Sequence, residues 1–227
     1  MTMLSKFKAV SRVLLTCGVT LLISHQARSE TQFGPFVVDQ AYPGVILLNG
    51  EIDLRSALEF RKALKAAPNA KLILLDSLGG SVQTGLLIAE EVFDRKMDTL
   101  VPANAICASA CSYIFFAGRS RKVSGRLGVH QLQSDVQDNA YTQLNVADVI
   151  EATSKYGTAA EVLALMLKTP SNQIHFFSEE EIVRYRINRI EESKIQSFET
   201  QPLADVAPQT ELNPMSIDKL LKSLGGG

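Results

Sequence analysis

The sequence is poor in several features, and each shortage narrows what the protein can do. Its 227 residues include only three histidines and three cysteines, so histidine or thiol chemistry has few candidates. No internal repeat occurs, which excludes a repeat architecture. No run of 18 apolar residues occurs either, so we expect a soluble mature chain, one that meets a membrane only through an uncleaved N-terminus.

Acidic residues are absent before Glu30. In that stretch basic residues precede an apolar run at 13–23, and small residues stand at 27 and 29. This order is typical of a secretory signal peptide, and 11 apolar residues are too few for a comfortable membrane span. We therefore predict a signal peptide at 1–29 and a periplasmic or secreted protein. An uncleaved N-terminal membrane anchor is the alternative.

Positive charge is also scarce once that segment is removed. The 23 basic residues include four of the segment, which leaves 19 against 24 acids and a net charge of −5. A mildly acidic exported domain argues against nucleic-acid binding. We expect neither a cofactor nor a metal site.

Strand and helix patterns alternate along the chain and predict one α/β domain at 30–195 with a mainly parallel sheet and flanking helices. Residues 196–227 show no period and are predicted to be a linker and a flexible tail. The expected strands are 36–39, 45–52, 71–76, 98–103 and 126–132, and the expected helices are 54–67, 82–95, 108–117, 143–156, 159–168 and 178–185.

Two short stretches carry candidate chemistry. Gly79 and Gly80 lie where a buried strand turns into a helix, so their N–H groups are suited to a phosphate or an oxyanion, although most such pairs are only turns. Ser109 follows another strand at a helix start, where the Ala110 N–H could stabilise an oxyanion. The simpler interpretation is that Ser109 only caps the helix.

His130 comes 21 residues after Ser109 and near the end of a strand. A neutral histidine is the usual base for a serine nucleophile, and a buried structural histidine is the alternative. Cys107 and Cys111 flank Ser109 at equal spacing. An oxidising compartment favours a disulfide between them, and two small side chains packed in the core are the alternative.

Three stretches taken together resemble the Clp protease proteolytic subunit family, within the wider crotonase-like fold, and in particular its exported relatives. They are DSLGGSVQTGLLIAEEV, CASACSYIFFAGRSRKVSGRLGVHQ and FFSEEEIVRY, in that order over about 75–185. The resemblance implies an acyl-enzyme serine peptidase that acts on peptides or unfolded segments, and a homo-oligomer. It implies Ser109 as nucleophile, His130 as general base, and Gly79 or Gly80 with Ala110 as the oxyanion hole.

The chain departs from the family at the third catalytic residue. The family has an aspartate just before the F-x-S segment, whereas SNQIHFFS (171–178) contains no acid. We predict that Asn172 holds the histidine instead, because an amide can do so in Cys-His-Asn proteases. His175, Asp135 and Asp138 are further candidates. The missing acid also fits a catalytically silent binding or assembly protein, and the fold would also admit an acyl-CoA enzyme of the crotonase type.

Overall fold

The computed structural model describes residues 30–132 and 139–190. The predicted signal peptide, the predicted linker and tail, and Asp135 and Asp138 lie outside the described residues. The elements in chain order are β1 (Glu30–Phe33), β2 (Phe36–Asp39), β3 (Val45–Asn49), α1 (Ser56–Ala66), β4 (Leu72–Asp76), α2 (Val82–Asp94), β5 (Asp98–Val101), β6 (Ile106–Ala108), α3 (Ala110–Ala117), β7 (Arg121–Val123), β8 (Arg126–Val129), α4 (Asn139–Lys155), α5 (Ala160–Lys168), β9 (His175–Phe176) and α6 (Glu179–Arg184).

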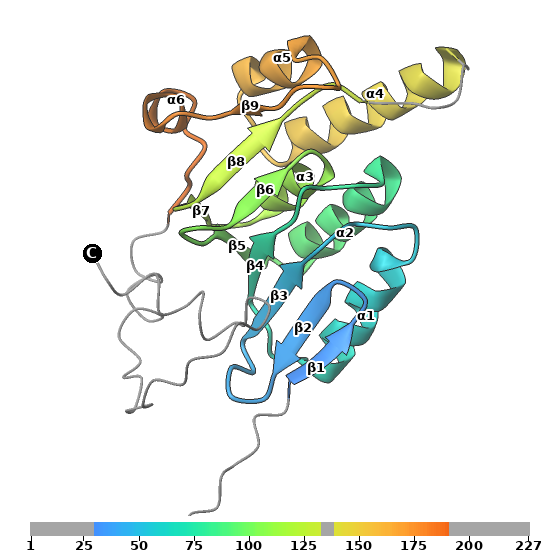
Figure 1. Ribbon diagram of the computed structural model, residues 1–227, viewed down its shortest axis with the longest axis vertical. Coiled ribbons are helices and arrows are strands. Elements are labelled where there is room, and N and C mark those ends of the chain that lie inside the picture. The colour runs from blue at the N-terminus through green and yellow to red at the C-terminus, as the bar shows by residue number, and fades with distance from the viewer. Residues whose placement is uncertain (1–29, 133–138, 191–227) are drawn as a thin grey trace, which may run out of the picture.

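Two sheets organise the described chain (Figure 1). The larger has the order β1-β2-β3-β4-β5-β7, in which β3, β4, β5 and β7 are parallel and β1 and β2 form an antiparallel margin. The smaller has the order β6-β8-β9, with β6 and β8 parallel and β9 antiparallel. The predicted parallel α/β architecture is therefore confirmed.

Burial explains the composition of the central strands. The apolar residues of β3 and β4 are all buried, and their sequences, VILLN and LILLD, run apolar without alternation. Such runs are typical of parallel strands that are covered on both faces. Helices α1 and α2 lie beside these strands (Figure 1).

Helix α3 connects the two sheets. It contacts β5 of the larger sheet and both β6 and β8 of the smaller one, and all eight of its residues are buried. A helix that is apolar on every side is expected in such a place. The aromatic run that follows Ser109 in the sequence is therefore core, and it anchors the C-terminal side of the serine turn.

The first helix differs from its prediction. The sequence pattern places Leu54, Leu58 and Leu64 on one side of the expected helix. Leu64 is buried, but Leu54 and Leu58 are 86% and 52% exposed, and Phe60 is buried in their place. The Asp53 carboxylate accepts hydrogen bonds from the Arg55 N–H and the Ser56 hydroxyl, which makes a separate turn before α1. The helix therefore starts later than predicted, and its inner face is the one that carries Phe60.

The basic residues at 119–122 favour a solvated turn when the sequence is taken alone, but the structure contradicts that interpretation. Arg121 is 3% exposed and donates hydrogen bonds to the carbonyls of Ile187, Phe116 and Tyr156. Arg119 forms an ion pair with Asp98 at 2.8 Å. The sequence pattern did not indicate the burial of Arg121, because arginines are rarely buried unless they are paired or hydrogen-bonded. Two of the carbonyls that accept from Arg121, those of Ile187 and Tyr156, come from distant parts of the chain.

Candidate active site

Ser109 occupies a strained turn between β6 and α3. Its backbone has φ 55° and ψ −126°, a region that residues with a side chain rarely adopt. Such a conformation costs about 1–3 kcal/mol and persists only when the surroundings impose it. A sharp strand-to-helix turn of this kind presents a serine hydroxyl outward in hydrolases.

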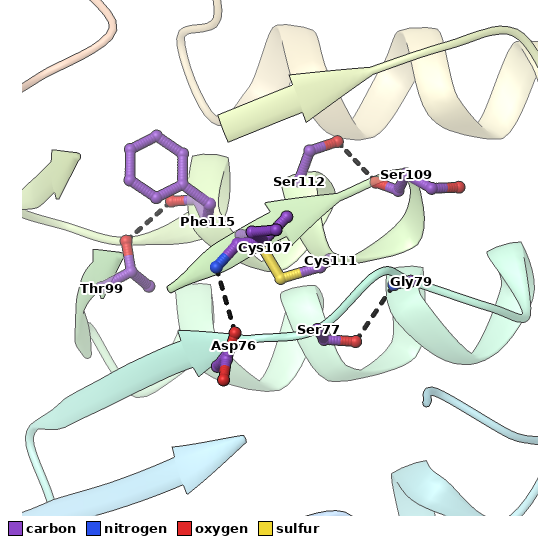
Figure 2. The surroundings of a disulfide bond; sticks show 10 residues. Asp76, Ser77, Gly79, Thr99, Cys107, Ser109, Cys111, Ser112 and Phe115 are labelled. Carbon is purple, nitrogen blue, oxygen red and sulfur yellow. Dashed lines mark hydrogen bonds between the residues drawn. A yellow bond between two sulfur atoms is a disulfide. The ribbon is translucent and has the colours of Figure 1, made fainter. Parts of the chain in front are cut away.

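The Ser109 side chain does not cap α3. Ser109 stands at the N-cap position, yet its hydroxyl accepts no hydrogen bond from the first turn of the helix. Figure 2 shows the hydroxyl pointing away from the disulfide. The cap interpretation of this serine therefore lacks its defining contact, and the hydroxyl is available for other chemistry.

Backbone contacts hold the turn on both sides. The Ser109 N–H donates to the Gly128 carbonyl of β8 at 3.1 Å. The Ser109 carbonyl accepts from the Ser112 N–H at 2.8 Å and from the Ser112 hydroxyl at 2.7 Å (Figure 2). The backbone carbonyl and amide of this residue are thus satisfied, and among residues 30–132 and 139–190 its side chain has no hydrogen-bond partner.

A disulfide joins Cys107 in β6 to Cys111 in α3, with Cα atoms 5.3 Å apart (Figure 2). Both cysteines are fully buried. The bond predicted from the compartment is therefore present. It forms because Cys107 belongs to the strand and the chain turns at Ser109, which brings the two Cβ atoms to the same side.

The glycine turn after β4 packs directly on the serine turn. Gly79 has φ +98°, and a Cβ on it would lie 2.7 Å from the Ser109 Cβ and 2.8 Å from the Ala110 nitrogen. Real Cβ atoms do not approach so closely, so the contact requires glycine. The two stretches singled out in the sequence are therefore in van der Waals contact.

The oxyanion donors predicted on this turn are not equivalent. The Gly79 N–H donates to the Ser77 hydroxyl at 3.1 Å, so it is already used (Figure 2). Among the described residues, the N–H groups of Gly80 and Ala110 have no hydrogen-bond partner. Ala110 begins α3, where the first N–H groups of a helix are unpaired. Of the two glycines, Gly80 is therefore the one with a free donor.

His130 lies one residue beyond β8. The parallel register pairs Ala108 with Gly128, so Ser109 and His130 both follow the carboxyl ends of neighbouring strands. The half-buried imidazole has its Nδ1 2.7 Å from the Gln131 carbonyl oxygen. A carbonyl oxygen can only accept, so Nδ1 carries the hydrogen and Nε2 keeps the lone pair. That tautomer is the one a general base for serine needs.

The structure gives Nδ1 a different partner from the predicted one. Asn172 is exposed in the turn after α5, and its side chain makes no hydrogen bond to His130 within the described chain. The Gln131 N–H donates to the Thr169 carbonyl, which anchors the residue whose carbonyl oxygen faces the imidazole. The role of Asn172 stays a prediction, with no contact to support it.

The other predicted orienting groups are engaged elsewhere or lie outside the described residues. His175 in β9 has its Nε2 3.1 Å from both carboxylate oxygens of Glu181. Ile174 packs beside Gly128, since a Cβ on that glycine would lie 2.5 Å from the Ile174 Cγ2. The side of β8 that faces the SNQIHFFS segment is therefore apolar near the site.

Sequence reasoning missed two groups at this site, the Ser77 hydroxyl and the Gln131 carbonyl. Ser77 lies two residues before Gly79, a spacing at which a serine can accept from a backbone N–H, so its signal was present. A main-chain carbonyl carries no sequence signal, because every residue has one.

Other features of the described chain do not add to the site. No group of three or more histidine, cysteine or acidic side chains could hold a metal ion in the part that the structure describes. None of the helices described there is long and apolar enough to cross a membrane. A surface hollow of about 450 Å³, lined by residues of α1 and α2 such as Arg61 and Glu91, contains none of the candidate residues.

No family model and no curated protein matches the chain. Among solved structures, the chain is similar to a mutant of the 1510-N membrane-bound stomatin-specific protease in complex with a substrate peptide, with 19% identity, a TM-score of 0.50, and 63% of this chain and 71% of that chain covered. A second mutant of that protease has 17% identity and a TM-score of 0.49, with 68% of this chain and 80% of that chain covered. A mutant of ClpP1 from Listeria monocytogenes has 23% identity and a TM-score of 0.49, with 64% of this chain and 89% of that chain covered. The first of these likenesses confirms the predicted fold class, a Clp-protease-like parallel sheet with flanking helices.

Proposed function

We propose that the protein is an exported serine peptidase that hydrolyses peptides or unfolded segments. The observation that carries the proposal is the strained turn at Ser109, whose hydroxyl does not cap α3. Ser109 directly follows β6, and His130 directly follows β8, the strand that pairs with β6. Strain of this kind is retained where function requires it. The peptide bound to the stomatin-specific protease of the same fold supports the substrate class.

The chemistry would proceed by acyl transfer in two stages. The Ser109 Oγ attacks the peptide carbonyl while the His130 Nε2 takes its proton, and the oxyanion accepts from the N–H groups of Ala110 and Gly80. The imidazolium then protonates the leaving amine. A water molecule, deprotonated by the same Nε2, hydrolyses the ester and releases Ser109.

The orienting group sets the expected rate. The Gln131 carbonyl holds the required tautomer of His130, but it brings a dipole rather than a full negative charge to the imidazolium. Loss of the tautomer-setting carboxylate lowers kcat by about 10⁴ in a serine triad. We therefore propose a slow hydrolase that keeps the geometry through a main-chain oxygen and lacks the electrostatic contribution of an acid.

The predicted setting limits the substrate further. The signal peptide predicted at 1–29 would deliver the chain to the periplasm or the exterior, where ATP is scarce. A partner that unfolds proteins with ATP would not operate there, so substrates would be short or already unfolded. We also propose a homo-oligomer, as the family resemblance implies.

One observation favours a second function. No carboxylate of the described chain contacts Nδ1 of His130, as expected for a binding or assembly protein that kept the fold and lost the activity. Such a protein would bind unfolded peptides without cleaving them. It would not need the hydroxyl of Ser109.

The two functions are separated by labelling the folded protein with a fluorophosphonate, which reacts with activated serines. We expect one label per chain, located on Ser109 by mass spectrometry, and none in Ser109→Ala. The control variant Ser124→Ala changes an exposed serine in the turn before β8 and should label normally. A folded wild-type protein that takes up no label would remove the peptidase and leave the binding protein.

A further inference from the structure

The disulfide is placed symmetrically about the strained residue. Cys107 lies two residues before Ser109 in β6, and Cys111 lies two residues after it in α3. Both side chains are fully buried in elements that are themselves packed in the core. The bond therefore closes a small covalent ring with Ser109 at its far point.

The non-covalent restraints on Ser109 are its hydrogen bonds and the close approach of Gly79 to its Cβ. One hydrogen bond to Gly128 holds its N–H, and two from Ser112 hold its carbonyl. The Ser112 bonds are local and would move with the start of α3. If φ relaxed to a negative value, the Ser109 Oγ and the Ala110 N–H would both change direction. That relaxation requires Cys107 and Cys111 to move relative to each other, which the disulfide prevents.

We propose that the Cys107–Cys111 disulfide is a positioning element of the catalytic turn, so that the oxidised chain is the active form. This inference rests on the proposed peptidase function. Reduction by a dithiol would break the S–S bond, form two thiols, and convert the dithiol to its own disulfide. The turn would then relax and turnover would fall. Export to an oxidising compartment would supply the active form.

The double variant Cys107→Ala/Cys111→Ala tests the proposal in the full chain, because the buried disulfide is poorly accessible to reductants in the folded protein. We expect kcat for a fluorogenic peptide to fall about ten- to hundredfold, the range expected for misplaced reacting groups, while KM stays within about twofold. The shape of the pH profile should not change, because His130 is untouched. A double variant that keeps the wild-type kcat and changes only KM or the pH profile would overturn the proposal.

A matched control separates positioning from loss of stability. Leu64→Ala removes a buried side chain of α1, which packs against α2, β1 and β2 and lies outside the serine turn. This variant should lose melting temperature and retain kcat. If it loses as much kcat as the double variant at equal stability, the disulfide has only a structural role and the proposal fails.

A second measurement is independent of activity and keeps the two hypotheses apart. Amide hydrogen exchange reports the hydrogen bond from the Ser109 N–H to Gly128. We expect protection of the Ser109 amide in the oxidised protein and faster exchange of that amide in the double variant, with protection in β4 and β5 unchanged. Unchanged exchange at Ser109 would overturn the positioning role even if the peptidase is confirmed. If the oxidised wild-type protein shows the expected exchange but has no activity, the peptidase function is rejected, and the effect of the disulfide on the conformation of the Ser109 turn is retained.

Discussion

At the scale of single residues, the candidate site depends on backbone conformations. Ser109 adopts a positive φ that a serine normally avoids, and Gly79 adopts one that only glycine tolerates at such close range. The sequence contains the residue types and their order, and from these the position of Ser109 near a helix start and that of His130 near the end of a strand were predictable. The sign of φ at Ser109 was not, because it results from contacts with Gly79, Gly128 and the disulfide.

Gly79→Ala should abolish turnover. The new methyl group would overlap the Ser109 Cβ and the Ala110 nitrogen, and alanine is strained at φ +98°, so the serine turn must shift. We expect a fall in kcat of about a hundredfold or more, measured with a fluorogenic peptide. The control is Gly44→Ala, where a Cβ meets no atom within 4 Å. Equal activity of the two variants would contradict the contact described for the two turns.

Asn172→Ala separates the two candidate partners of His130. If the Gln131 carbonyl fixes the tautomer, as its 2.7 Å contact with Nδ1 indicates, removal of the exposed amide should leave kcat within about twofold. Steady-state kinetics at neutral pH measure this. A tenfold fall would assign the orienting role to Asn172, as the sequence analysis predicted, and would imply that it reaches the imidazole when substrate is bound.

At the scale of elements, some of the local patterns predicted their structure well and others did not. The spacing of Ser178 and Glu181 is the sequence pattern of a capping box, and α6 has one: the Ser178 hydroxyl accepts from the Glu181 N–H, and the Glu181 carboxylate accepts from the Ser178 N–H. Short strands such as β6, β7 and β9 were missed, since two or three residues show no period. Two of these missed strands, β6 and β9, belong to the small sheet, and β6 leads directly into Ser109.

Ser178→Ala should weaken the anchoring of α6. Loss of an N-cap typically costs about 1 kcal/mol, and here the bond that is lost is the one from the Glu181 N–H to the Ser178 hydroxyl. We expect a decrease of that size in the free energy of unfolding, measured by urea denaturation. Ser178→Asp keeps an acceptor at the cap and should restore most of the loss. If both variants lose stability equally, the cap is not what stabilises this helix.

At the scale of the whole molecule, two arginines join the C-terminal segment to the core. Arg121 donates to the carbonyls of Ile187 and Tyr156, and Arg189 donates to those of Gly118 and Arg119. Burial, and then the charge of Arg189, lowers the pKa of Arg121 to about 9, so its guanidinium remains charged at neutral pH. These are long-range contacts, which explains why the sequence pattern suggested only a basic turn.

Arg121→Met should destabilise the whole domain. It removes a donor from three buried carbonyl oxygens, of which that of Tyr156 keeps a bond from Arg189, at about 1 kcal/mol or more for each lost bond. We expect a loss of ~3 kcal/mol or more and a fall in melting temperature of at least ~6 °C, measured by circular dichroism. Lys71→Met, at an exposed position, should change the stability by less than ~0.5 kcal/mol. A melting temperature of Arg121→Met equal to that of Lys71→Met would contradict the anchoring role.

The short bridge between Ser77 and Cys107 joins the large sheet to the small one beside the candidate site. The Ser77 N–H donates to the Ile106 carbonyl at 2.6 Å, and the Ala108 N–H donates to the Ser77 carbonyl at 3.0 Å. One proposed oxyanion donor, the Gly80 N–H, belongs to the chain that leaves the large sheet, whereas the other, the Ala110 N–H, and the proposed nucleophile Ser109 follow the small sheet. The distance between these two N–H groups consequently depends on how the two sheets are placed relative to each other. A neighbouring subunit or a bound strand that shifts one sheet against the other would therefore change the geometry of the proposed oxyanion hole without contacting the side chain of Ser109 or His130.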